Sequence, residues 1–282
     1  MTRAAPIATP IPAPPPCVVA LASRDRVRTL LRHTFSRRYA SLYLVRTRRE
    51  LAAAFHRRLV DAAIIDLAAP TEDTVAALAL AREFPSAPFL GMTPLRASDT
   101  SLAARAAAAD FADIVVEQVD DVVLRQLVEE QAFTRRFAQA LHEPPPVLQL
   151  ESRIQRQAWE VLVSHGGRPI LTDVIALALG VSREHLSRAF SVAGAPNIKR
   201  VIDLVRLIAA AELAKNPGYD VGDVADVLGF ASSSHLSTAA IRIAGTRPTS
   251  LARLRAVDII ERFTRDRSRS RGAAPSQTRT AK

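Results

Sequence analysis

The same short pattern occurs twice in the C-terminal half of the chain, and this repeat constrains the fold more than any other feature. The first copy is IALALGVS followed by REHLSRAF, over residues 175–190, and the second is VADVLGF followed by ASSSHLST, over residues 224–238. In each copy an apolar segment ends at Gly180 or Gly229, and glycine readily takes the positive-φ conformation that ends a helix. Each copy therefore predicts a helix, a tight glycine turn and a second helix.

A serine opens the second helix of each copy. Ser182 and Ser232 are placed to accept hydrogen bonds from the free N–H groups of the first turn. Leu186 and Leu236 are expected to face inward while their polar neighbours face out. A helix, a tight turn and a capped helix with a polar outer face form the helix-turn-helix signature, whose second helix enters the major groove of DNA. One such copy is a weak indication, but two in one chain are much stronger.

The segment between the two copies, residues 198–215, predicts a long connecting helix. Its eighteen residues at about 1.5 Å each span roughly 27 Å, and successive major-groove faces of DNA lie about 34 Å apart. The helix is therefore long enough to hold the two units apart. Its apolar residues recur at close to a helical period and are Val201, Ile202, Val205, Ile208, Ala209 and Leu213.

Residues 150–255 resemble the DNA-binding domain of the AraC/XylS family of bacterial transcription regulators, in which one chain carries two helix-turn-helix units joined by a long helix. The first unit is one residue shorter than the family pattern between Ser187 and Gly194, and the second has Thr238 and Ala240 where Arg and Phe are usual. The matching positions are Gly180, Val181, Ser182, residues 185–190, Arg206, Leu207, Ala225, Gly229, Phe230, residues 234–237 and residues 245–248.

The resemblance implies that the second helix of each unit contacts DNA. Family positions matching Glu184, Ser187 and Arg188 face base edges, where Arg can hold guanine by two hydrogen bonds and Glu can accept one from cytosine. The alternative for Arg188 and Glu184 is a solvated helix face. The short hydroxyls of the second unit reach less far, so that unit is expected to position the domain more than to specify sequence. The DNA-binding residues expected are Ser182, Arg183, Glu184, His185, Ser187, Arg188, Ser232, Ser233, Ser234, Ser237, Thr238 and Arg242.

The N-terminal half alternates five short apolar runs with helix-like segments, which predicts a doubly wound α/β domain with a parallel sheet. The runs are continuously hydrophobic, as expected of strands that are buried on both faces. Strands are predicted at residues 18–22, 42–45, 62–67, 88–93 and 114–116, and helices at residues 25–35, 48–58, 73–84, 98–109 and 120–140.

This α/β domain resembles a response-regulator receiver. The resemblance rests on the order of the elements, on Asp66 at the end of the third strand with Pro70 four residues later, and on Thr93 at the end of the fourth strand. It implies that Asp66 occupies the position of the phosphoacceptor.

Two departures from the receiver pattern argue against phosphorylation. Ala22 and Ser23 stand where a receiver has the acidic pair that holds Mg²⁺, and Asp25 comes later, in the first helix. Glu117 stands where a receiver has a lysine, and it adds a negative charge to the site. Phosphoryl transfer to Asp66 needs a cation to neutralise the gathering charge. We therefore expect a structural, docking or dimerisation role instead of a phosphorylation switch.

Composition supplies the remaining boundaries. The chain carries a formal net charge of +10, and its last 21 residues hold seven basic residues and one acidic residue. Such a tail attracts DNA phosphates without reading bases. The expected segments are a disordered Ala- and Pro-rich lead-in at 1–16, the α/β domain at 17–140, a Pro-rich linker at 141–150, the helical DNA-binding domain at 151–261 with Trp159 in its core, and a disordered basic tail at 262–282.

Several classes of protein are excluded. Cys17 is the single cysteine, so an internal disulfide is impossible, and no apolar run is long enough to cross a bilayer. His185 and His235 recur at matched positions without a cluster of other metal ligands, and no catalytic spacing stands out. We expect no enzyme activity, cofactor or metal. The expected protein is a bacterial, cytoplasmic regulator whose partners are double-stranded DNA, RNA polymerase or another regulator, and a second copy bound through the N-terminal domain, with no membrane.

Two other interpretations remain open. The α/β domain could be a protein-docking module whose helical domain has lost DNA binding, and salt-dependent, sequence-selective retention on DNA separates the two. The chain could also sense a small molecule, for which the sequence offers no ligand pocket.

Overall fold

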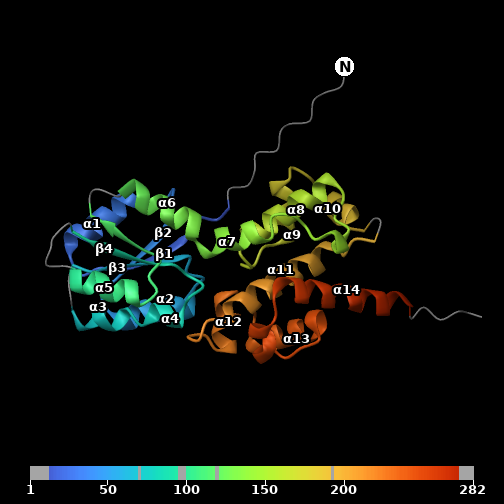
Figure 1. The fold of residues 1–282 in the computed structure, drawn as a ribbon. Helices are drawn as coiled ribbons and strands as arrows, with labels where there is room; N and C mark the ends of the chain where they lie inside the picture. Colours follow the sequence, from blue (N-terminus) through green and yellow to red (C-terminus); the bar gives the residue numbers. More distant parts are fainter. Residues whose placement is uncertain (1–12, 69–70, 95–99, 118–120, 192–193, 273–282) are drawn as a thin grey trace, which may run out of the picture.

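The computed structural model describes residues 13–68, 71–94, 100–117, 121–191 and 194–272. Within these ranges an α/β body from the N-terminal half and an all-helical body from the C-terminal half lie side by side (Figure 1). Most of the predicted lead-in, Pro70 and the last ten residues of the predicted tail lie outside the described residues.

The α/β body contains a five-stranded parallel sheet in the order β2-β1-β3-β4-β5 over the described residues. Every residue of β1 and β3 is buried, whereas the edge strand β2 contains exposed and half-buried residues. This confirms the predicted doubly wound fold, in which the strand order reverses beside β1. The strands are β1 (Cys17–Leu21), β2 (Ser41–Val45), β3 (Ala62–Asp66), β4 (Phe89–Thr93) and β5 (Asp113–Val116).

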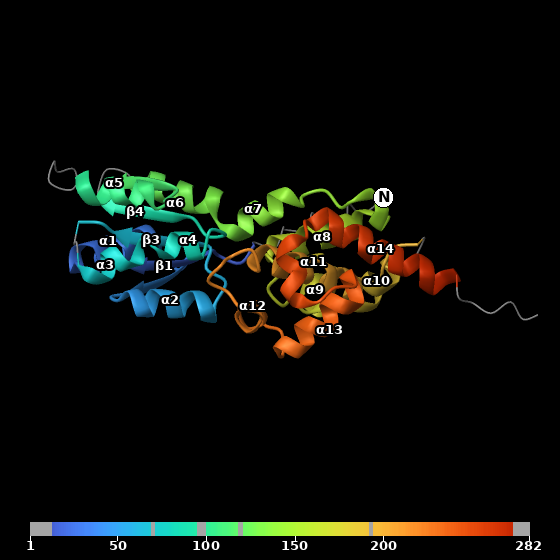
Figure 2. The same cartoon turned by 60° about the horizontal axis from the view of Figure 1, so that its bottom comes forward.

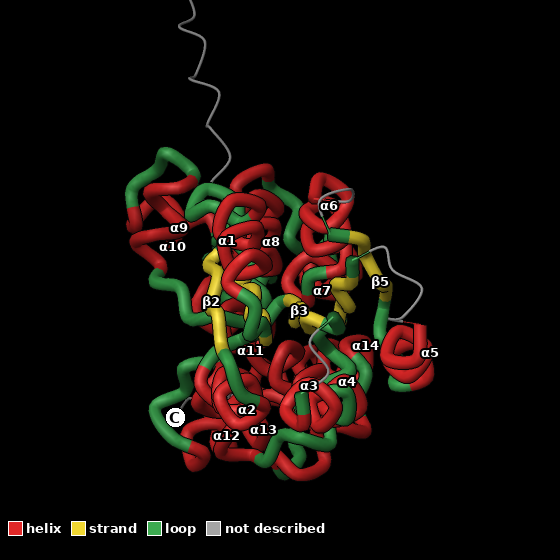
Figure 3. The backbone as a smooth tube through the Cα atoms, turned by 90° about the vertical axis from the view of Figure 1, so that its left-hand side faces the viewer, coloured by secondary structure: helices red, strands yellow, loops and turns green. Residues whose placement is uncertain are grey.

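Helices cover both faces of the sheet (Figure 3). On one face α1 and α6 bury Leu31 and Leu124 against Val18, and on the other α2 to α5 bury residues such as Phe55 and Ala106. The two faces give two apolar layers, which explains why the inner strands are continuously hydrophobic. These helices are α1 (Asp25–Thr34), α2 (Arg48–Arg57), α3 (Glu72–Ala77), α4 (Leu80–Glu83), α5 (Thr100–Ala108) and α6 (Asp121–Gln131).

Two predicted helices are divided in the structure. The helix expected at 73–84 is split at Leu78 and Ala79 into α3 and α4. The helix expected at 120–140 is interrupted at Ala132, whose ψ of 139° is not helical, and α7 (Phe133–Ala140) begins immediately after it. The N–H groups of the next two residues donate to Asp61, one to its carbonyl and one to its side chain. A distant acceptor therefore replaces the local helical bonds, and sequence periodicity carries no sign of it.

The helical body has one continuous core, and α11 lies at its centre with most of its residues buried. Trp159 is fully buried, and its indole N–H donates to the carbonyl of Leu141 at 2.7 Å, which confirms its predicted place in the core. The elements that follow α7 are η2 (Pro146–Leu148), α8 (Arg153–Ser164), α9 (Thr172–Ala178), α10 (Arg183–Ala189), α11 (Ile198–Leu213), α12 (Val221–Val227), α13 (Ser233–Ala244), η3 (Pro248–Arg253) and α14 (Ala256–Gly272).

The helical core extends beyond the segment predicted for it at both ends. Phe137, Leu148 and Leu150 are buried in the helical core, so α7 and the Pro-rich segment at 141–150 belong to that core and do not form a free linker. At the other end α14 continues to Gly272, with Phe263 fully buried, although disorder was expected from residue 262. The composition of these segments suggested a linker and a tail, but their buried apolar side chains pack into the helical core.

A buried ion pair joins the two bodies. Asp61, immediately before β3, is fully buried, and its carboxylate lies 2.7 Å from Nη2 of Arg168, in the loop between α8 and α9. The same carboxylate accepts from the backbone N–H groups of Cys17 at 2.8 Å and Thr134 at 3.0 Å. A buried charge is tolerated only when it is paired and hydrogen-bonded, and Asp61 meets both conditions through contacts from both bodies.

A second set of contacts lies where α12 meets α2 (Figure 2). Asn216, almost fully buried before α12, accepts from the backbone N–H of Ser86 at 2.8 Å. The hydroxyl of Tyr219 donates to the carbonyl of Phe55 at 3.2 Å. The two bodies are thus held together by specific polar contacts at two separate places.

We expect Arg168→Met to lower the free energy of unfolding by about 3 kcal/mol, because the variant leaves the Asp61 carboxylate buried without its cation. Urea denaturation measures this loss. The matched control is Arg46→Met, which removes an exposed pair with Asp25 and should cost less than about 1 kcal/mol.

The reactivity of the Cys17 thiol tests the Asp61–Arg168 contact independently, because the backbone N–H of Cys17 donates to the same carboxylate. Burial, with the negative charge of Asp61 beside it, raises the pKa of Cys17 to about 12, so the native thiol should react very slowly with thiol reagents at pH 8. Faster labelling of Arg168→Met than of Arg46→Met would show that the contact has loosened. Equal stability and equal labelling in the two variants would contradict the role given to Arg168.

Candidate nucleic-acid interface

The first helix-turn-helix unit is formed by α9 and α10. Gly180 makes the turn with a φ of +63°, a conformation that glycine adopts without strain. The side chain of Ser182 accepts from the backbone N–H of His185 at 3.1 Å and so caps α10. Leu186 is fully buried beneath the helix. The local geometry expected from the sequence is therefore present.

All but one of the residues expected to contact DNA in this unit are exposed. Arg188 is exposed and forms no ion pair with any residue that the structure describes. Arg183, by contrast, lies 3.2 Å from the carboxylate of Asp173 in an exposed pair. Ser187 is half-buried. The others, all exposed, are Ser182, Glu184 and His185.

Gln155 on α8 orients this recognition helix, and sequence reasoning missed it. Its side chain is almost fully buried and donates to the carbonyl of Ala189, at the end of α10, at 2.9 Å. Its amide oxygen also accepts from the backbone N–H of Ser152 at 2.8 Å, which completes a capping box at the start of α8. The spacing of Ser152 and Gln155 is the sequence signal that identifies such a box.

The second unit repeats this geometry with α12 and α13. Gly229 makes the turn with a φ of +62°, and the side chain of Ser232 accepts from the backbone N–H of His235 at 3.1 Å. The hydroxyls of Ser237 and Thr238 donate to carbonyls one turn earlier in α13, at 2.9 and 3.0 Å. These short side chains are bonded to their own helix. Ser232, Ser233, Ser234, His235 and Thr238 are exposed, and Ser237 is half-buried.

Arg242, also expected at the DNA surface, is engaged within the protein. Its Nη2 lies 2.6 Å from the carboxylate of Asp203 on α11. The pair ties α13 to the connecting helix. The two units therefore differ: the first presents an arginine without a carboxylate partner among the described residues, whereas the second has its arginine paired.

Arg206 of α11 stabilises the turn of the second unit. Its Nη2 donates to the carbonyls of Leu228 at 3.0 Å and Gly229 at 3.1 Å, at the end of α12. Its guanidinium carbon lies 4.1 Å from the centre of the Phe230 ring, a cation–π distance. Burial lowers the pKa of Arg206 despite the opposing effect of Asp203, and the side chain nevertheless stays charged because an arginine titrates far above neutral pH.

We expect Arg206→Met to lower the free energy of unfolding by about 2 kcal/mol, because two helix-end carbonyls lose a charged donor and the ring loses its cation. Thermal unfolding measures the loss. Lys199→Met, at an exposed position of the same helix, is the control and should change stability by less than about 0.5 kcal/mol. If the two variants unfold alike, Arg206 does not hold the turn.

A charged cluster lies at the other side of the molecule, at the carboxyl ends of β1 and β3. Arg24, which follows β1, holds the Asp66 carboxylate by two nitrogens, with Nε–Oδ2 at 2.9 Å and Nη2–Oδ1 at 2.5 Å. The same Nη2 contacts the carboxylate of Glu117. Asp66 and Glu117 are buried. Although burial opposes it, hydrogen bonding to the two carboxylates raises the pKa of Arg24 above its ordinary value.

This cluster changes the interpretation of the receiver-like site. Glu117 was expected to add an unbalanced negative charge beside Asp66. Arg24 pairs with both carboxylates, and its single positive charge offsets one of the two negative charges. Asp25 points outward: its side chain is 89% exposed and pairs with Arg46 at 3.4 Å. The receiver pattern concerns acidic residues at this point of the chain, so it gives no signal for Arg24.

Within the described residues, no group of three or more His, Cys, Asp or Glu side chains is arranged to hold a metal ion. Over the same residues, no helix is both long and apolar enough to span a membrane.

Comparison with a family model identifies the C-terminal region. A model described as a helix-turn-helix domain matches residues 175–253, which run from α9 through η3 and include both units. This region is an AraC-type helix-turn-helix domain, and such a domain implies DNA binding and a role in transcription regulation. Regulators of this kind are typically not enzymes. A search of curated proteins gave no match.

Three solved structures match this chain at low identity. The receiver domain of a signal transduction histidine kinase from Syntrophus aciditrophicus is 20% identical over 41% of this chain and 89% of that chain, with a TM-score of 0.35. Full-length FixJ from B. japonicum is 16% identical over 80% and 96%, with a TM-score of 0.35. The RcsB response regulator from Salmonella typhimurium is 18% identical over 67% and 98%, with a TM-score of 0.34. The receiver-type fold assigned to the α/β body follows from its strand order, which is that of flavodoxin and of a single-domain receiver.

Proposed function

We propose that this protein is a sequence-specific transcription regulator that reads two successive major-groove segments through α10 and α13. The observation that carries this proposal is the pair of serine-capped helices with exposed polar faces, one at each side of α11. The 16 residues of α11 are about 24 Å long, which suits units that meet grooves one helical turn apart. The protein would act in the bacterial cytoplasm.

The two units would differ in what they contact on DNA. Arg188 of the first unit is exposed and has no carboxylate partner among the described residues, so it can reach a base edge. In the second unit Arg242 is paired with Asp203, and the hydroxyls of Ser237 and Thr238 are bonded to their own helix. Side chains held in this way reach the DNA backbone more readily than the base edges, and backbone contacts position a protein without reading sequence. The first unit would therefore dominate specificity.

The α/β body would serve as a phosphorylation-independent module for docking or for pairing with a second copy. Arg24 pairs with Asp66 at the carboxyl ends of the strands. At their amino ends, the α/β body contacts the helical body through the Asp61–Arg168 pair and the Ser86–Asn216 hydrogen bond. Contact with RNA polymerase or another regulator belongs to the same proposal. The proposed domain boundary lies near Ala132, where the helical core begins.

We expect Arg188→Ala to weaken binding to the preferred DNA site, found first by genomic footprinting, by about 1 to 3 kcal/mol and to relax base preference at one position. Titration of preferred and random DNA duplexes at fixed salt measures both effects. Arg135→Ala removes the same charge from an exposed position on α7 and should leave the ratio of the two affinities unchanged.

The outcome separates the proposal from the interaction-module alternative. If the wild-type protein shows no preference for any DNA sequence at physiological salt, the helical domain has lost its reading function and the alternative holds. If Arg188→Ala binds both duplexes as the wild type does, base reading lies elsewhere in the two units.

The basic C-terminal segment should add affinity without specificity. Deleting residues 266–282 leaves the buried Phe263 in place and should weaken binding to all duplexes alike, reducing the salt slope by about one for each phosphate that the segment no longer neutralises. A control that replaces Arg267, Arg269 and Arg271 by Lys keeps the charge and should bind nearly as the wild type does. A weakening confined to the preferred duplex would contradict a role limited to phosphates.

We expect no phosphorylation of Asp66. The Arg24 guanidinium pairs with both oxygens of the Asp66 carboxylate, so a cation and a phosphoryl group would have to displace it. Incubation with Mg²⁺ and acetyl phosphate, followed by intact-mass spectrometry, measures this. A stoichiometric phosphoryl adduct that disappears in Asp66→Ala would overturn the expectation.

A further inference from the structure

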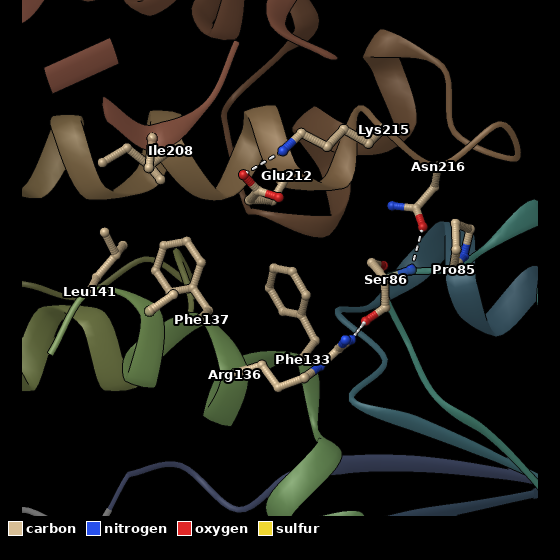
Figure 4. A pocket seen from close by; sticks show the side chains of 12 residues that line it. Pro85, Ser86, Phe133, Arg136, Phe137, Leu141, Ile208, Glu212, Lys215 and Asn216 are labelled. Atoms are coloured by element: carbon tan, nitrogen blue, oxygen red, sulfur yellow. Dashed lines mark hydrogen bonds and ion pairs between the residues drawn. The ribbon is translucent and has the colours of Figure 1, made fainter. Parts of the chain in front are cut away.

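A cavity of about 430 Å³ lies where α7 faces α11 of the helical body, and Pro85 and Ser86 of the α/β body also line it (Figure 4). Its walls are mainly apolar, with Phe133, Phe137 and Leu141 on one side and Ile208 on the other. The two phenyl rings are stacked with centroids 5.9 Å apart. Apolar cavities at domain junctions with a few polar groups are the usual form of small-molecule sites.

The polar groups of this cavity carry one positive charge in excess. Lys215 and Glu212 neutralise each other at 2.7 Å. Arg136 donates to the carbonyl of Ser86 but forms no ion pair with a carboxylate of the described residues. The amide of Asn216 is already used, because its oxygen accepts from the Ser86 N–H and its nitrogen donates to the carbonyl of Leu213.

We propose that this cavity binds an amphipathic monocarboxylate, with its apolar body between the phenyl rings and Ile208 and its carboxylate paired with Arg136. One carboxylate balances the one excess charge. A neutral apolar ligand leaves Arg136 without a counter-ion, a cation is repelled by it, and a dianion meets the negative charge of Glu212 after the first charge is matched.

The site lies apart from both DNA-reading helices, but it touches elements that matter to them. α7 follows the α/β body directly, and α11 connects the two helix-turn-helix units. A ligand in the cavity would therefore contact both α7 and α11. The inference goes beyond the proposed DNA-binding function, and its test uses no DNA.

Isothermal titration of the full chain with 4-phenylbutyrate, 4-phenylbutanamide and 4-phenylbutylamine tests the proposal, with octanoate as an aliphatic acid. We expect at least one of the two acids to bind with a dissociation constant below about 1 mM, the amide to bind about tenfold more weakly than 4-phenylbutyrate, and the amine not to saturate. Arg136→Gln should weaken acid binding about tenfold and leave amide binding unchanged. Arg135→Gln, an exposed neighbour on α7 outside the cavity lining, should change neither.

A second variant tests the location. Ala140 lines the cavity from an exposed position, so Ala140→Trp should fill it and abolish acid binding, whereas Gln139→Trp, next to it but outside the lining, should not. Circular dichroism checks that each variant is folded. If Ala140→Trp does not fold, the comparison of acid binding by the wild type and Arg136→Gln tests the proposal. Absence of saturable binding of both acids, or equal acid binding by the wild type and Arg136→Gln, overturns the proposal.

Discussion

The buried pair of Asp61 and Arg168 is the contact on which the arrangement of the whole molecule depends. A carboxylate without access to water must be fully bonded, and Asp61 gathers its donors from β1, α7 and the loop after α8. That loop approaches α11 so closely that a Cβ atom on Gly167 would lie 2.2 Å from the Cβ of Ala209. One charge thus fixes the start of α7, the position of the loop and, through it, the position of α11.

α11 connects this junction to the proposed reading surface. It carries three consecutive alanines at 209–211, all fully buried, and such small residues allow neighbouring elements to approach closely from more than one side. The same helix supplies Asp203 to α13, Arg206 to the turn after α12, and Ile208 to the cavity beside α7. The cavity and the second unit therefore contact the same helix.

The two edges of the parallel sheet have separate roles. Asp61 precedes β3 and Asp66 ends it. The amino ends of the strands therefore contact the helical body, and the carboxyl ends carry the Arg24 cluster. Asp66 ends β3, as the receiver pattern predicts for a phosphoacceptor, but here its carboxylate is paired with the guanidinium of Arg24. The Arg24 side chain thus joins the residues that follow β1, end β3 and follow β5, which is the contact behind the proposed docking role.

The sequence by itself determined the elements whose signals are local. Gly180, Ser182, Gly229 and Ser232 predicted both helix-turn-helix units because turns and caps depend on residues within a few positions of one another, and buried strands follow from unbroken apolar runs. Only the tertiary structure decided which charges pair. Arg24 meets Asp66 and Glu117 across 42 and 93 residues, and Arg242 meets Asp203 across 39. The break at Ala132 and the packing of Phe263 have the same origin, since distant side chains outweighed local propensity and composition there, and no pattern along the chain encodes which distant partner a side chain will meet.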